Sequence, residues 1–153
     1  MRVLPVILAG TLLAMSACST AGVVPTDKHS DDAAKLQGKW KLTRATFNGL
    51  PLSGDASLII SGDQYIMTYE GNLTPSVFKL GTAGPNTIWV FHHEESPFAS
   101  QGFWGGTLTG IYQLSGDRLR ICFDLTGRTY PKNFEAGKGS GRGLFEYKRE
   151  TPD

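Results

Sequence analysis

Short runs of alternating apolar and polar residues fill the chain from about residue 36 onward, with glycine-containing turns between them. The clearest alternation lies in residues 118–124, where Leu119, Ile121 and Phe123 would share one face of an extended chain. Such a run predicts a strand with one core face and one solvated face. Similar runs, rich in aromatic and β-branched residues, predict strands at residues 39–47, 57–60, 64–69, 76–80, 87–92, 107–114, 118–124 and 143–149.

The connections between these runs are short and rich in turn-forming residues. Ser-Gly-Asp begins at residues 53, 61 and 115, and the last two copies fall between expected strands, which is typical of hairpin turns. A further short strand is expected at residues 133–136, and one helical turn at residues 33–37. The fold class predicted is all-β, an antiparallel eight-stranded barrel, with a β-sandwich as the alternative.

The N-terminus has the pattern of an export signal. Arg2 precedes an apolar run over residues 3–15, which is too short for a spanning helix of about 20 residues. Met15-Ser16-Ala17-Cys18 resembles the lipobox of bacterial lipoproteins. The resemblance implies that residues 1–17 are removed and that Cys18 carries the lipid anchor. Ser19 follows the cysteine, which by the same resemblance implies an outer-membrane lipoprotein facing the periplasm.

Composition then divides the remaining chain into two parts. Residues 18–34 are rich in small and polar residues and are expected to form a flexible tether, and residues 35–150 form one domain. The chain has 15 basic and 14 acidic side chains, so losing Arg2 with the signal leaves equal numbers of each. A neutral exported protein is not expected to bind nucleic acid.

Several motifs resemble those of a lipocalin-like domain family of unknown function that is expanded in planctomycete bacteria. They are the segments at residues 36–42, 48–52 and 110–123, with Pro131, Phe134 and residues 139–141 and 148–150. The resemblance implies a lipocalin-type barrel and no particular activity. The family often has Arg-Pro where this chain has Tyr130-Pro131, and whether Arg128 substitutes for that arginine is open.

The resemblance also implies a structural pair. In lipocalins the tryptophan of Gly-x-Trp begins the first strand and closes one barrel end, and a basic residue of the last strand packs on it. Trp40 and Arg149 match these positions. A guanidinium over an indole contributes about 0.5–2 kcal/mol. This pair is expected to be a plug without a catalytic role.

The titratable residues do not assemble into a known catalytic or metal-binding pattern. In residues 92–95, His-His-Glu-Glu, adjacent strand residues would point to opposite faces, so a strand running into a solvated loop is favoured over a metal site. Ser100 and Ser140 have no patterned histidine partner, and Cys122 is expected to be a small buried strand residue. We therefore expect no enzymatic activity, no cofactor and no metal.

Basic residues gather in the second half of the domain. Residues 118–142 contain six basic and two acidic side chains. This segment is interpreted either as an anion-binding face, including one for acidic lipid headgroups, or as a solvated outer face of the barrel.

Binding is the function class that remains. Interior candidates for a pocket are Tyr65, Met67, Val90, Tyr112 and Phe123. Phe98, Phe103 and Trp104 lie in a long glycine-bounded loop, either as a lid or partner contact or as filler of the barrel end. The function predicted is a non-enzymatic envelope lipoprotein that binds a small apolar or amphipathic ligand or a protein partner. The alternative is an inhibitor or immunity protein that blocks an envelope enzyme through an exposed loop.

Overall fold

The computed structural model describes residues 28–92 and 106–152. The expected signal, Cys18, and the loop residues Phe98, Phe103 and Trp104 lie outside these ranges, so what is predicted for them stays a prediction. The described elements are α1 (Lys28–Leu36), β1 (Gly38–Phe47), β2 (Leu50–Pro51), β3 (Ala56–Ser61), β4 (Gln64–Tyr69), β5 (Asn72–Leu80), β6 (Thr87–His92), β7 (Gly106–Ser115), β8 (Arg118–Asp124) and β9 (Arg142–Arg149).

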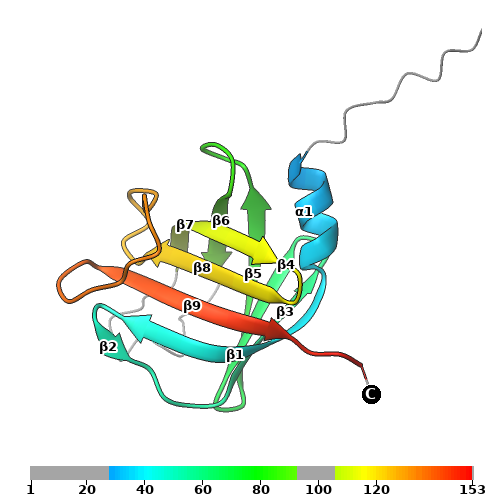
Figure 1. Cartoon of the computed structure of the whole chain (residues 1–153), viewed down its shortest axis with the longest axis horizontal. Helices are drawn as coiled ribbons and strands as arrows, with labels where there is room; N and C mark the ends of the chain where they lie inside the picture. The colour runs from blue at the N-terminus through cyan, green and yellow to red at the C-terminus, as the bar shows by residue number, and fades with distance from the viewer. Residues whose placement is uncertain (1–27, 93–105, 153) are drawn as a thin grey trace, which may run out of the picture.

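The strands form a closed antiparallel barrel (Figure 1). From β3 onward each strand pairs with the next, and β9 returns to pair with β1 along most of its length. The two-residue strand β2 is an addition to the end of β1, so the closed ring has eight strands. Closure pairs both edges of every strand in the ring, which a sandwich does not do. The predicted eight-stranded lipocalin-like barrel is confirmed.

Strand β1 contains a β-bulge that sets which side chains enter the barrel. Its pairing with β9 shifts between Leu42 and Arg44. Trp40 is buried before the bulge, and Ala45 and Phe47 are buried after it, whereas Arg44 is exposed. The extra residue, Thr43, therefore keeps Arg44 on the outer face while the apolar residues that follow return to the core.

Two local predictions differ from the structure. The strand expected at residues 133–136 is wrong, because this segment lies in the connection between β8 and β9 and has no strand pairing. Both edges of β8 are already occupied by β7 and β9, so the closed barrel offers no edge to it. The helix is longer than the single turn expected and begins at Lys28, within the segment expected to be tether.

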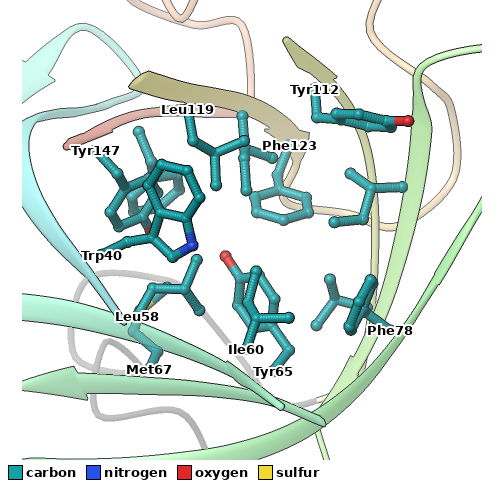
Figure 2. Close-up of a cluster of buried hydrophobic side chains, with 14 of the residues drawn as sticks. Trp40, Leu58, Ile60, Tyr65, Met67, Phe78, Tyr112, Leu119, Phe123 and Tyr147 are labelled. Atoms are coloured by element: carbon teal, nitrogen blue, oxygen red, sulfur yellow. The ribbon is translucent and has the colours of Figure 1, made fainter. Parts of the chain in front are cut away.

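The barrel interior is packed with large side chains (Figure 2). The five interior candidates, Tyr65, Met67, Val90, Tyr112 and Phe123, are each at most 2% exposed and belong to one core cluster. Edge-to-face contacts join Phe123 to Tyr65 and to Phe145, with ring centroids 6.4 and 6.0 Å apart. These residues fill the barrel along its length.

Within residues 28–92 and 106–152, no helix has the length and apolar content needed to cross a membrane.

Candidate functional site

One end of the barrel is closed by α1 and by two residues of the first and last strands. The Trp40 indole is fully buried and its Nε1 donates to the Leu36 carbonyl at 2.9 Å. The Arg149 guanidinium lies 4.1 Å from the centre of the Trp40 ring and also donates to the Gln37 and Lys35 carbonyls, the first at 2.7 Å. A cation at the last carbonyls of a helix is favourable. The pair expected from the family resemblance thus also holds α1 to the barrel.

The other contacts of α1 complete this closed end. The Tyr112 hydroxyl donates to Asp32 Oδ2 at 2.7 Å, and Lys28 Nζ donates to Asn86 Oδ1 at 2.8 Å. Burial and the Asp32 carboxylate both raise the pKa of Tyr112. Helix and strands therefore close this end with polar as well as apolar contacts.

The barrel centre contains buried hydroxyl groups. Tyr65 points its hydroxyl between Trp40 and Ile60 (Figure 2), and it interacts with the hydroxyl of Tyr147 across the barrel. Burial raises the pKa of both phenols. Within the described residues, these two hydroxyls and that of Thr74 lack a well-formed hydrogen bond. Because buried hydroxyls normally have a partner, we expect the two phenols to bond to each other or to a buried water.

The opposite end of the barrel contains an apolar hollow of about 560 Å³. It is lined by Phe47, Asn48, Leu50, Pro51, Leu52, Ser53, Tyr69 and Leu125. Most of this lining comes from residues 48–53, which follow β1. The rest is Phe47 at the end of β1, Tyr69 at the end of β4, and Leu125 directly after β8. Leu50 is 71% exposed, so an apolar side chain stands at the rim of the hollow. We call this feature the open-end hollow.

The walls of the open-end hollow are held by specific contacts. Asn48 and Gly49 both have positive φ, at 47° and 85°, as a tight hairpin turn requires. A Cβ on Gly49 would lie 2.5 Å from the backbone nitrogen of Lys138, so only glycine fits there. Gly49 N donates to the Ala136 carbonyl at 2.7 Å, and the Tyr69 hydroxyl donates to the Ser53 carbonyl at 2.8 Å. The hairpin is thus fixed to both neighbouring segments.

The binding residues predicted from the sequence do not line the open-end hollow. None of Tyr65, Met67, Val90, Tyr112 and Phe123 lines it, because all five lie deeper in the barrel. The residues that line it were missed, although Leu50-Pro51-Leu52, an apolar run directly after an Asn-Gly turn, was a signal that could have found them. Strand β6 ends at His92, which pairs with Gly106 at the start of β7. This pair lies at the same end of the barrel as the hollow.

A long connection from β8 to β9 covers part of the outer wall and is organised by one carboxylate. Asp124 is only 8% exposed and accepts hydrogen bonds from the backbone N–H and hydroxyl of both Thr126 and Thr129. Burial opposes ionisation, but these bonds outweigh it and lower the pKa of Asp124. In the same connection, the Tyr130 hydroxyl is hydrogen-bonded to Thr82 Oγ1 at 2.6 Å.

Potential catalytic groups in the described residues are not brought together. Cys122 is fully buried, and burial raises the pKa of its thiol despite the nearby Arg142 and Arg120. A buried thiol of this kind is a packing residue and a poor nucleophile. Residues 28–92 and 106–152 contain no group of three His, Cys, Asp or Glu side chains able to hold a metal ion. The segment at residues 93–95 lies outside the described residues.

Comparison with protein-family models, with curated proteins and with solved structures finds no match to this chain. The class of protein is therefore defined by the fold and the site, as a lipocalin-like β-barrel with an apolar hollow at one end.

Proposed function

We propose that this protein is a non-enzymatic lipoprotein of the bacterial envelope that binds a small apolar or amphipathic ligand in the open-end hollow. The observation that carries the proposal is the hollow itself, about 560 Å³ in volume with a lining of mostly apolar side chains. Small-molecule sites are usually concave, mostly apolar and of about 300–1,000 Å³. A guest there would bury the exposed Leu50 side chain and the edge of Phe47.

The rim of the hollow favours an amphipathic guest over a purely apolar one. Asn48, Ser53 and the Tyr69 hydroxyl are polar groups beside an apolar floor. The same chemistry is compatible with an apolar side chain of a protein partner. A small ligand is favoured because the volume of the hollow, about 560 Å³, lies in the usual range of small-molecule sites.

The proposed anchor is consistent with the direction from which the chain enters the barrel. Helix α1 contacts the closed end, whereas β2 lies on the opposite side of the barrel (Figure 1). The open-end hollow is lined in part by Leu50 and Pro51 of β2. A lipid on Cys18 would therefore attach the chain on the side of the closed end. The hollow would then face away from the anchoring membrane.

Leu50→Asn is expected to weaken binding of the neutral apolar fluorophore 1-N-phenylnaphthylamine about tenfold, because it removes one buried leucine contact. Leu73→Asn is the matched control. Leu73 is 65% exposed but does not line the hollow, so its substitution is expected to leave the Kd unchanged. Fluorescence titration measures both. Equal effects of the two substitutions, or no saturable binding by the parent protein, would contradict the proposed site.

Cys18→Ala is expected to move the protein from the membrane fraction to the soluble fraction of cells that process lipoproteins. The reason is that two or more acyl chains give stable anchoring, which the variant cannot acquire. Fractionation and the mass of the N-terminal peptide measure this. Membrane association of the parent protein without an acyl mass on its Cys18 peptide would rule out the anchor, whatever the hollow binds.

A further inference from the structure

The outer wall of β1, β9 and β8 carries a row of like charges. Lys148 on β9 lies directly opposite Lys41 on β1, and on its other side it lies opposite Arg118 on β8. All three side chains are exposed. Like charges directly opposite on neighbouring strands repel and destabilise a sheet. These three cations are therefore not expected to stabilise the barrel.

The acidic side chains on the same wall form their ion pairs outside this row, although Glu146 also lies opposite Arg44 of β1. Glu146 pairs with Arg120 at 3.1 Å, and Glu150 pairs with Lys39 at 2.8 Å. Among the described residues, neither of these pairs includes Lys41, Arg118 or Lys148, and Arg44 on β1 also has no ion pair. We call Lys41, Arg44, Arg118 and Lys148 the basic face.

The surface between these cations is concave. One shallow hollow of about 320 Å³ is lined by Arg118 and Lys148, and by Arg120 with its ion-pair partner Glu146. Another of about 420 Å³ is lined by Lys41 and Lys148, and by Glu150, which is paired to Lys39. Each hollow thus contains at least two cations outside these ion pairs, and phosphate groups can accept hydrogen bonds from several such donors at once.

We infer that the basic face binds the phosphate headgroups of an anionic lipid surface. Clusters of four or more basic residues close to a membrane attachment are attracted to anionic lipids. Lys41 follows Trp40 of the closed end, and Lys148 precedes Arg149, so the row lies at the end where α1 joins the barrel. The membrane's proximity rests on the proposed anchor, because residues 19–27 span about 30 Å at most.

An acidic protein partner is the other class of ligand that a basic surface can take. The position of the basic face, next to the entry of the N-terminal segment, favours the membrane. The balanced charge of the chain without its signal also means that this face, and not a general positive charge, would produce the attraction.

The test uses the full chain with Cys18→Ser, which cannot be acylated, in co-sedimentation with two kinds of vesicle. One kind is phosphatidylcholine alone, and the other contains three parts phosphatidylglycerol in ten. The apolar run at residues 3–15 is common to every sample, so the difference between the two vesicles isolates the effect of charge. We expect tighter binding to the anionic vesicles, with the preference falling as salt is raised.

Replacing Lys41, Arg118 and Lys148 together by Gln is expected to reduce the anionic preference about a hundredfold, at about fivefold per side chain. The matched control replaces Lys79, Lys132 and Lys138, which are exposed cations outside β1, β8 and β9. It is expected to keep most of the preference. The variant that lacks Lys41, Arg118 and Lys148 is also expected to melt at the same or a higher temperature than the parent, because it relieves repulsion between like charges. Loss of folding would then not explain its weaker binding.

Equal losses in the two triple variants, or equal binding to neutral and anionic vesicles, would overturn the inference. Binding of this face to soluble polyglutamate without a vesicle preference would also overturn it, in favour of an acidic protein. Titration of the same variants with 1-N-phenylnaphthylamine keeps the two proposals separate, since the basic face does not line the open-end hollow.

Discussion

Trp40→Ala is expected to lower the free energy of unfolding by about 3–5 kcal/mol, the usual cost of removing a large buried aromatic side chain. Trp40 is fully buried, contacts the core cluster, and hydrogen-bonds the last turn of α1. Its loss leaves a cavity, frees the Leu36 carbonyl and removes the surface on which Arg149 lies. Urea denaturation followed by circular dichroism measures the change.

Trp89→Ala is the matched control for this substitution. Trp89 lies on the outer wall of β6, partly exposed, stacked on Phe91 and 5.9 Å from Lys79 Nζ. Its truncation is expected to cost about 1 kcal/mol, because most of its lost contacts are at the surface. Equal losses in the free energy of unfolding for Trp40→Ala and Trp89→Ala would contradict the role of Trp40 in closing the barrel.

Asp124→Asn is expected to cost about 2–3 kcal/mol at neutral pH, because a buried carboxylate loses its charge-assisted bonds to Thr126 and Thr129. The pKa of Asp124 is lower in the folded protein than its ordinary value. Its contribution is therefore fully present above an ordinary pKa of about 4 and is lost as pH falls through the folded pKa. The difference in stability between the parent and the variant should therefore narrow as pH falls below about 4.

The control for Asp124 is Glu135→Gln, an exposed carboxylate in the same connection. It is expected to change stability by less than about 0.5 kcal/mol at any pH. Unfolding curves at pH 7, 5 and 3 compare the three proteins. A gap between the parent and Asp124→Asn that stays constant over this range would show that ionised Asp124 does not organise the connection.

The barrel was predictable because its strands carry their own pattern. In β8 the alternation of Leu119, Ile121 and Phe123 with polar residues matches their burial in the structure. The helix was largely missed because only Leu36 among its nine residues is buried, so it has no apolar stripe. The short strand at residues 133–136 was predicted wrongly because local sequence does not tell which strand edges are already paired.

Both proposed binding surfaces depend on contacts between distant parts of the sequence. The row of Lys41, Lys148 and Arg118 exists only because the first and last strands meet in a particular register. The open-end hollow needs Leu125, which follows β8, to line the same space as the hairpin that contains Leu50. Neither arrangement follows from local composition, whereas the pairing of Trp40 with Arg149 could be expected because the family resemblance supplied the long-range contact.

The central claim is that the open end of the barrel is a ligand site. Titration of isotope-labelled protein with 1-N-phenylnaphthylamine, followed by amide chemical shifts, tests it most directly. The proposal predicts saturable shifts concentrated at Phe47, Leu50, Leu52, Tyr69 and Leu125. Shifts confined to the outer wall around Trp89 and Phe91, or shifts that grow linearly without saturation, would contradict it.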